Sequence, residues 1–251
     1  MTGNRKRQII LENNSIIKMK KISIISGGSS GLGLEIAEQL VKSGKNVTVL
    51  GRDPEKLAKA VIRLKKGAKN TSVDLFICNI GNETEVKKFG NYITDNHLVT
   101  EYLFNNAGRG LFTKANTSTS AMIDAVFEAN IKGMILLTSE ILRITPDEEE
   151  LSIVNIMSTS ALFGRAEETI YCAAKWGARG YTEALRTELK GTKRNIVAIY
   201  PGGMRTGFWQ VTDDNRDISG FMDPAEVAEK IVNAVLVTDK LFVSDITIKR
   251  K

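Results

Sequence analysis

Histidine, cysteine and proline are scarce in this sequence of 251 residues, which contains one histidine, two cysteines and four prolines. Cys78 and Cys172 are too few for the disulfide framework of a small secreted protein, so we expect a reducing compartment, the cytoplasm. The single His97 leaves no group of imidazoles for a metal site and gives little support for a Ser–His hydrolase. The composition therefore predicts a protein without a metal centre.

Long apolar runs are also missing. No stretch of about 20 consecutive apolar residues is present, so no segment is expected to span a membrane. The short run Ile9–Leu11 is followed at once by Glu12 and two asparagines, which makes it too short for the core of a signal peptide. With 42% hydrophobic and 25% charged residues, the composition is that of a soluble globular protein, and we expect no membrane partner.

The formal net charge is +6, and part of the positive charge is concentrated near the N-terminus. The basic residues there are Arg5, Lys6, Arg7, Lys18, Lys20 and Lys21. Such an arm can bind nucleic acid or an anionic membrane, or it can be a solvated leader. No platform of interleaved basic and aromatic residues accompanies it, so we interpret residues 1–20 as a basic N-terminal extension and expect no nucleic-acid partner.

From residue 21 onward, short β-branched runs alternate with longer helical patterns. The expected strands are Ile22–Ser26, Asn46–Leu50, Ser72–Ile77, Glu101–Phe104, Leu151–Met157 and Asn195–Ile199. Several are apolar throughout, as in a parallel sheet that is covered on both faces. Asp53-Pro54 and Asp223-Pro224 each place an N-cap and a proline at the start of a helix. The pattern predicts an α/β fold with a doubly wound parallel sheet (a Rossmann fold), forming one domain over residues 21–251.

A glycine-rich turn follows the first expected strand. It reads Ser-Gly-Gly-Ser-Ser-Gly-Leu-Gly over residues 26–33 and leads into a helical pattern at residues 34–43. Glycines in this position let the backbone approach a pyrophosphate, whose charge then lies at a helix N-terminus. The spacing of Gly27, Gly31 and Gly33 differs from the commoner G-x-G-x-x-G pattern, so the position between strand and helix carries the prediction of a dinucleotide site.

The end of the second strand bears on which dinucleotide is bound. An NAD site places an acid there for the ribose 2′-hydroxyl, whereas a 2′-phosphate favours an arginine. Here Gly51 is followed by Arg52, and Asp53 is better explained as the N-cap of the next helix. Arg52 therefore favours NADP(H) over NAD(H), with a plain surface charge as the alternative interpretation.

Tyr171 and Lys175 lie four residues apart, which places them on one face of a helix. A nearby ammonium favours the phenolate, so we expect Lys175 to move the pKa of Tyr171 down from about 10 toward neutrality. Ser158 follows the fifth strand, where its hydroxyl can hold a substrate carbonyl near the tyrosine. Asn130, in a helical stretch, can orient a water that supplies protons to the lysine.

Together these segments resemble the short-chain dehydrogenase/reductase family over about residues 21–248. The family's glycine motif, its N-N-A-G segment at residues 105–108, its catalytic Asn, its Ser, its Y-x-x-x-K pair and its P-G segment with a following threonine occur in order. The resemblance implies the catalytic residues Asn130, Ser158, Tyr171 and Lys175. The implied cofactor-binding residues are Gly27, Ser29, Ser30, Gly31, Leu32, Gly33, Arg52, Asn79, Ile80, Asn106, Ala107, Gly108, Tyr171, Lys175, Pro201, Gly202 and Thr206.

Several features depart from the family pattern, among them Ser26, where threonine is usual, and Met157, which replaces the first of two common serines. Asn79 stands where an Asp usually holds the adenine amino group, a role that its amide oxygen can fill without charge. Ser30 stands where many NADP(H)-dependent members carry a basic residue, so the cofactor preference depends on Arg52. The chain ends on Asp245–Lys251 without the glycine-rich tail of many members.

By resemblance, the reaction is hydride transfer between the nicotinamide and a carbonyl or secondary alcohol, as in a carbonyl reductase. Residues 203–222 are expected to cover the carboxyl end of the sheet, which suggests a small apolar ketone or aldehyde as substrate. The residues expected to line that pocket are Phe208, Trp209, Phe221, Met222, Leu111, Phe112 and Phe163, with packing of the covering segment on the body as the alternative role of its aromatic residues. A non-catalytic NADP(H)-binding redox sensor or scaffold is the alternative. The resemblance also implies a homodimer or homotetramer formed through the helices that contain Asn130 and Tyr171.

Overall fold

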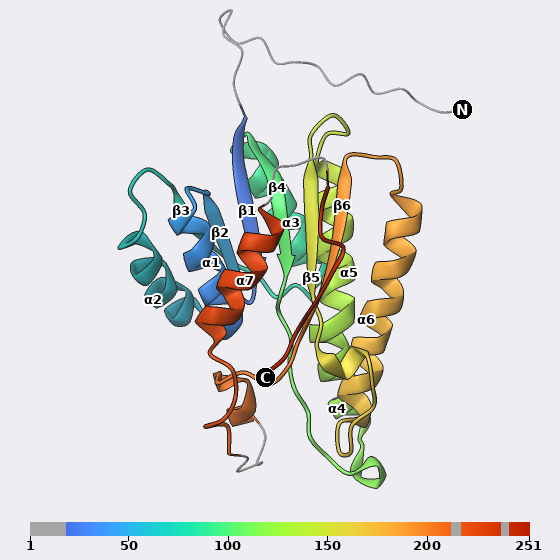
Figure 1. Cartoon of the computed structure of the whole chain (residues 1–251). Helices are drawn as coiled ribbons and strands as arrows, with labels where there is room; N and C mark the ends of the chain where they lie inside the picture. Colours follow the sequence, from blue (N-terminus) through green and yellow to red (C-terminus); the bar gives the residue numbers. More distant parts are fainter. Residues whose placement is uncertain (1–18, 212–216, 237–240) are drawn as a thin grey trace, which may run out of the picture.

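The computed structural model describes residues 19–211, 217–236 and 241–251, and its centre is a parallel sheet of seven strands (Figure 1). Their order across the sheet is β3-β2-β1-β4-β5-β6-β7. From β1 to β3 each new strand is added toward one edge of the sheet, and from β4 to β7 each is added toward the other edge, so the order of addition switches between β1 and β4. The strands are β1 (Lys20–Ser26), β2 (Val47–Gly51), β3 (Val73–Ile77), β4 (Leu98–Asn105), β5 (Leu151–Ile156), β6 (Arg194–Pro201) and β7 (Asp245–Ile248). The expected doubly wound fold is confirmed, whereas most of the basic extension lies outside the described residues.

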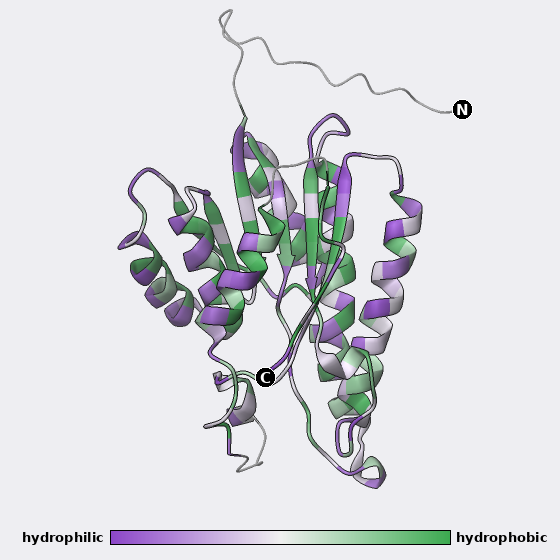
Figure 2. Ribbon diagram, in the orientation of Figure 1, coloured by the Kyte–Doolittle hydropathy of each residue, from purple (hydrophilic) through white to green (hydrophobic). Residues whose placement is uncertain are grey.

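Helices cover both faces of the sheet. One face carries α1 (Gly31–Lys42), α2 (Pro54–Lys65) and α7 (Pro224–Val235), and the other carries α3 (Glu83–Asp95), α5 (Gly133–Ile144) and α6 (Thr169–Glu188). Two clusters of buried aliphatic side chains fill the space between the helices and the sheet. Figure 2 shows the hydrophobic residues on the strands and on the inward sides of the helices. None of the helices in the described ranges is both long and apolar enough to cross a membrane.

Polar side chains fix where the helices begin. The Asp53 carboxylate accepts hydrogen bonds from the N–H groups of Glu55 and Lys56, both at 3.0 Å, directly before α2. The Asp223 carboxylate accepts from Ala225 N–H at 2.8 Å before α7. Each satisfies N–H groups that the first turn of a helix leaves unpaired. The two expected Asp-Pro helix starts are therefore confirmed.

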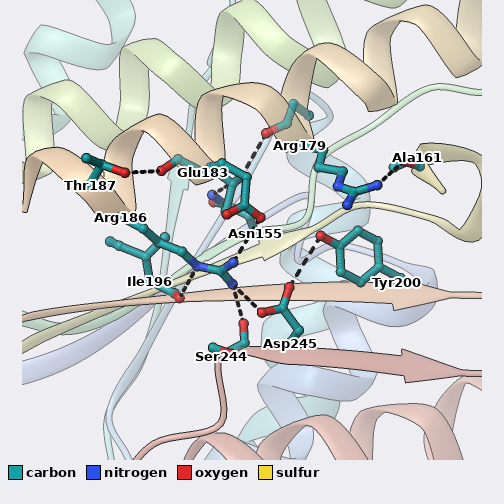
Figure 3. A network of polar contacts seen from close by, with 12 residues as sticks. Asn155, Ala161, Arg179, Glu183, Arg186, Thr187, Ile196, Tyr200, Ser244 and Asp245 are labelled. Carbon is teal, nitrogen blue, oxygen red and sulfur yellow. Dashed lines mark hydrogen bonds and ion pairs between the residues drawn. The ribbon is translucent and has the colours of Figure 1, made fainter. Parts of the chain in front are cut away.

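The seventh strand was not expected from the sequence, because its four residues contain only two apolar side chains. It pairs in parallel with β6 and is held by a polar network around Arg186 of α6 (Figure 3). Arg186 contacts the Asp245 carboxylate at 3.0 Å, the Ile196 carbonyl at 3.1 Å and the carbonyl of Ser244. The Tyr200 hydroxyl donates to the other Asp245 oxygen at 3.4 Å. This network joins α6 to the edge of the sheet.

Candidate active site

The glycine-rich turn lies at the carboxyl end of β1, where it contacts the segment after β4. The Ser26 hydroxyl accepts hydrogen bonds from the N–H groups of Asn106 and Ala107 at 3.0 and 3.1 Å. Gly27 and Gly31 have φ angles of +65° and +53°, a region that residues with a side chain rarely adopt. The sequence thus forms a turn that, together with the N-terminus of α1, lines a cleft.

Gly33 has a packing role in this turn. A Cβ at Gly33 would lie 2.4 Å from the Gly27 carbonyl oxygen and 2.4 Å from Asn106 Nδ2. The residue therefore permits close packing of α1 on the turn, and it does not line the cleft described next. Its packing role is therefore clear, and its direct contact with a cofactor stays a prediction.

A cleft of about 800 Å³ runs across the carboxyl ends of the strands. It brings together all but two of the expected site residues, the exceptions being Gly33 and Asn130. Those that line it are Gly27, Ser29, Ser30, Gly31, Leu32, Arg52, Asn79, Ile80, Asn106, Ala107, Gly108, Ser158, Tyr171, Lys175, Pro201, Gly202 and Thr206. Residues from seven separate segments thus meet where a doubly wound sheet binds its ligands.

At one end of the cleft, two cations follow β2. Arg52 and Lys56 both line this end, near the glycine-rich turn. Asp53 also lines it, but one of its carboxylate oxygens accepts the two N-cap hydrogen bonds of α2. The expected N-cap role of Asp53 is confirmed. Its second carboxylate oxygen lies 3.9 Å from Lys56 Nζ, so this end of the cleft carries two cations and one anion.

The side chain of Asn79 is engaged within the protein. Its Nδ2 donates to Glu128 at 3.0 Å, and its Oδ1 accepts from Gly81 N–H at 3.2 Å. Glu128 itself lines the cleft. It could not be predicted from the sequence, because it lies 49 residues from Asn79 and belongs to no recognisable motif. A carboxylate is therefore present next to the position at which this chain has Asn instead of the usual Asp.

Ser158, Tyr171 and Lys175 meet at the other end of the cleft. Ser158 follows β5, and Tyr171 and Lys175 lie one turn apart on α6. Tyr171 and Lys175 are only 6% and 4% exposed, and Lys175 Nζ lies 5.7 Å from the centre of the Tyr171 ring. Lys175 Nζ also donates to the Ile156 carbonyl at 3.2 Å, which holds the ammonium at the end of the strand.

Burial dominates the acid–base properties of this pair. It raises the pKa of Tyr171 well above its usual value of 10; a hydrogen bond from Ser158 acts in the opposite direction, and the Glu168 charge adds to the rise. Burial also lowers the pKa of Lys175 from 10.5 to about 8. The expected fall of the Tyr171 pKa toward neutrality is therefore wrong for this structure, because burial disfavours the phenolate. Tyr171 is a protonated phenol at neutral pH.

Asn130 lies behind the cleft, in a single π-helical turn (η2, Glu128–Lys132) between α4 (Ser120–Phe127) and α5. Its Nδ2 donates to the carbonyls of Val126 and Arg109 at 2.9 and 2.8 Å. Its buried Oδ1 accepts no hydrogen bond from the described residues and points to where a Cβ of Gly108 would be, 2.8 Å away. The extra residue of the π turn thus directs an open acceptor toward the region of Lys175.

Four aromatic side chains, here called the aromatic cover, form an apolar lining near Tyr171: Phe112, Phe208, Trp209 and Phe221. The Phe208 ring lies 5.7 Å from the Tyr171 ring, and Trp209 stacks on Phe112 at 5.0 Å. The indole of Trp209 donates to the Met204 carbonyl at 2.8 Å, which fixes its orientation. The expected apolar pocket is therefore present for these four residues.

Three other residues expected in that pocket lie elsewhere. Leu111 packs with a small cluster on α4 and α6, and Met222 packs against the main core. Phe163 is exposed, next to Arg165 and Lys249. The cleft also contains three polar side chains that were not predicted from the sequence, namely Ser160, Arg165 and Glu168. No cluster of potential metal ligands occurs within the described ranges.

Comparisons with known proteins agree with this architecture. A protein of Chlorobaculum tepidum named sepiapterin reductase is 27% identical over 238 residues, covering 92% of this chain and 96% of that protein. A short-chain dehydrogenase/reductase of Vibrio parahaemolyticus has a similar structure, with a TM-score of 0.79, 29% identity, and coverage of 92% of this chain and 100% of that one.

A second solved structure, described as the closed form of serine dehydrogenase complexed with NADP⁺, shows the same fold. Its TM-score is 0.82 at 22% identity, with 90% of this chain and 94% of that chain covered. The sequence model of the family described as short chain dehydrogenase matches residues 21–217, which is most of the chain. This protein belongs to the short-chain dehydrogenase/reductase family of oxidoreductases.

Proposed function

We propose that this protein is a carbonyl reductase that uses NADP(H) and interconverts a ketone or aldehyde with the corresponding alcohol. The observation that carries the proposal is a cleft with cations and a glycine turn at one end, and Ser158 with the buried Tyr171 and Lys175 at the other. A dinucleotide that spans the cleft would bring its nicotinamide next to the phenol of Tyr171. The similarity to a protein named sepiapterin reductase supports a reductase.

The residues at the nucleotide end fit a phosphorylated dinucleotide. The backbone of Gly27–Leu32 and the N-terminus of α1 suit a pyrophosphate, because unpaired N–H groups and the helix dipole favour negative charge. Arg52 and Lys56 suit a ribose 2′-phosphate. The solved relative described as a complex with NADP⁺ supports the same choice of cofactor. When bound, NADPH supplies the hydride that reduces the carbonyl carbon.

The residues at the other end supply the proton. In the proposed reaction the Ser158 hydroxyl donates a hydrogen bond to the carbonyl oxygen, and the Tyr171 hydroxyl transfers its proton to that oxygen as the carbon is reduced. The product is the alcohol, and the phenolate left on Tyr171 is stabilised by the Lys175 ammonium. Asn130 would hold the water through which the proton is replaced. The pKa of Tyr171 is raised by burial, so its hydroxyl holds the proton that reduction requires.

We further propose that the protein works as a cytoplasmic homo-oligomer. The large apolar side chains Ile123, Phe127, Ile135 and Trp176 are exposed on α4, α5 and α6 and would be covered in a dimer formed through these helices. Cys78 and Cys172 are buried free thiols, as suits a reducing compartment. Sedimentation of the purified protein tests the oligomer, and a monomer at micromolar concentration contradicts it.

A first experiment titrates the protein with NADPH and NADH while following nicotinamide fluorescence. We expect tighter binding of NADPH, and Arg52→Ala should weaken it roughly 10- to 100-fold through the loss of a charge-assisted hydrogen bond. The same substitution should change NADH binding far less. Equal affinities for both cofactors in the unchanged protein would contradict the NADP(H) preference, and binding of neither would contradict the proposed reaction.

A second experiment tests catalysis with a panel of ketones and diketones. Tyr171→Phe should lower kcat roughly 100- to 10,000-fold, as expected for loss of a general acid, while NADPH binding is retained. Retained turnover in this variant would exclude Tyr171 as the proton donor. Tight NADPH binding without turnover of any carbonyl compound by the unchanged protein would instead favour the redox sensor.

A further inference from the structure

The nucleotide end of the cleft continues past Arg52 to a wall that phosphate binding does not use. β2 and β3 end side by side, where the Cys78 N–H donates to the Gly51 carbonyl at 2.8 Å. Asn79, the next residue, lines the cleft there together with Glu128. In the proposed function Arg52 binds the phosphate of a ribose, so the base carried by the same ribose would lie against this neighbouring wall.

Asn79 uses both ends of its amide within the protein. Its Oδ1 accepts from Gly81 N–H at 3.2 Å, and its Nδ2 donates to Glu128 Oε1 at 3.0 Å. These two contacts fix the orientation of the amide, because a reversed amide would place its oxygen against the carboxylate. The charged acceptor at this wall is therefore the carboxylate of Glu128, and the amide of Asn79 holds it.

Two glycines allow Glu128 to reach this wall from η2. A Cβ on Gly81 would lie 2.3 Å from Glu128 Cγ and 2.4 Å from its Oε1, so the side chain fits only beside a glycine. A Cβ on Gly133 would lie 2.6 Å from Ile80 Cγ1, so the π turn can pack closely on the segment after β3. Close packing thus positions the carboxylate in addition to the hydrogen bond from Asn79.

The protein leaves part of the Glu128 carboxylate available to a ligand. Within the described ranges this carboxylate accepts one hydrogen bond, from Asn79, and takes part in no ion pair. Lys56, a cation of the same end of the cleft, pairs with Asp53 at 3.9 Å instead. A carboxylate has two oxygens and can accept several hydrogen bonds, so a donor in the cleft can bind here.

We infer that Glu128 is a specificity-determining residue that accepts a hydrogen bond from the 6-amino group of adenine, and that Asn79 is a positioning residue for its carboxylate. The inference rests on the proposed function, in which the cleft binds a dinucleotide, and it gives Glu128 the role expected of the Asn79 amide oxygen. The adenine amino group is a hydrogen-bond donor and matches a carboxylate, whereas a keto oxygen at the same position is an acceptor and would be repelled.

The hypoxanthine analogue of NADPH tests this inference, because it carries a keto oxygen in place of the 6-amino group. Binding of both dinucleotides is followed by nicotinamide fluorescence, so the readout does not require turnover. We expect the unchanged protein to bind NADPH about tenfold or more tightly than the analogue. Glu128→Gln should lower this ratio by about tenfold, because the glutamine amide can donate to the keto oxygen.

The ratio separates recognition of the base from general damage. A distorted site weakens both dinucleotides alike and leaves the ratio as it was. Glu83→Gln makes the same chemical change at an exposed glutamate of α3 that does not line the cleft, and it should leave both affinities unchanged.

A double variant exchanges the two partners. Asn79→Asp combined with Glu128→Gln keeps one carboxylate and one amide at this wall and moves the negative charge to position 79. The glutamine amide can then donate to the new aspartate, as Asn79 now donates to Glu128. We expect the double variant to recover most of the preference for NADPH over its hypoxanthine analogue. Failure to recover it would contradict a role based on the carboxylate.

The outcomes distinguish this inference from the proposed function. Equal binding of NADPH and its analogue by the unchanged protein overturns the inference, and so does a ratio that Glu128→Gln leaves unchanged. A ratio that Asn79→Ala abolishes while Glu128→Gln does not would assign the acceptor to Asn79 instead. In each of these cases NADPH still binds and the proposed function stands. If neither dinucleotide binds, the proposed function itself fails.

Discussion

The two ends of the cleft are built in different ways. At the nucleotide end, the glycine-rich turn between β1 and the first turn of α1 lines the cleft with residues that follow one another closely in sequence, namely Gly27, Ser29, Ser30, Gly31 and Leu32. The substrate end is formed by side chains from segments far apart in the chain, such as Phe112, Glu168 and Trp209. Backbone recognition tolerates few substitutions, whereas side chains can be exchanged one at a time. The chain therefore has a cofactor end that its local sequence defines and a substrate end that only the folded structure defines.

Gly33→Ala should have the largest effect, and it should act at the nucleotide end alone. A methyl group here would lie 2.4 Å from the Gly27 carbonyl oxygen, so the turn or α1 must move. We expect NADPH binding, measured by fluorescence, to weaken about 100-fold, in line with the cost of overpacking a tight site.

Gly180→Ala is the matched control for this variant. Gly180 lies on α6 with no atom near the position of a Cβ, so alanine fits there and NADPH binding should be unchanged. Thermal unfolding separates a local effect from a global one. Normal NADPH affinity in Gly33→Ala would show that the nucleotide end adapts as readily as a side-chain pocket, which would remove the contrast between the two ends.

The same contrast explains what the sequence could and could not reveal. The turn at Ser26–Gly33 and the pair Tyr171 and Lys175 are recognisable because their spacing along the chain is short and fixed by backbone geometry. Six strands were recognisable from their apolar runs, whereas β7 depends on Arg186 and its network rather than on its own residues. Glu128 and Glu168 could not be singled out, since only tertiary packing brings them to the cleft.

The properties of the catalytic pair were also beyond the sequence. A spacing of four residues places Tyr171 and Lys175 on one helix face, but it does not reveal how deeply the fold buries them. Burial raises the pKa of the phenol and lowers that of the ammonium, opposite to the effect expected from their attraction. The spacing therefore predicts that the two groups share a helix face, but it does not predict the direction in which burial moves their pKa values.

Trp209→Ala should have an intermediate effect, confined to the substrate end. The indole contacts the rings of Phe112, Phe208 and Phe221, and its removal opens the aromatic cover. We expect KM for propiophenone to rise about tenfold, from lost apolar contact of about 1–2 kcal/mol. The NADPH dissociation constant should stay the same. A parallel loss of NADPH affinity would show that the two ends are coupled.

The pH dependence of kcat/KM should give the smallest effect. It concerns Lys175 and Tyr171, which lie where the two ends of the cleft meet. Since burial lowers the pKa of Lys175 to about 8, its ammonium is lost as the pH rises through that value, and the phenolate formed on Tyr171 loses its stabilisation. Tyr171, with its raised pKa, stays protonated over the same range. We expect kcat/KM for reduction to fall by up to about tenfold between about pH 7 and about pH 9.

Unfolding does not account for this fall in kcat/KM, because the contribution of Lys175 to the free energy of unfolding changes with pH in the opposite direction. The unfolded lysine keeps its proton up to about pH 10.5, whereas the folded one releases it near pH 8, so the contribution of Lys175 to stability increases with pH between these values. Activity and stability should therefore change in opposite directions in this window, as measured by steady-state kinetics at saturating NADPH and by denaturant unfolding at each pH. If the reduction rate stays constant up to about pH 9.5, burial does not lower the pKa of Lys175, and the lysine keeps its charge. It would then behave as an ordinary, solvated ammonium between the two ends of the cleft.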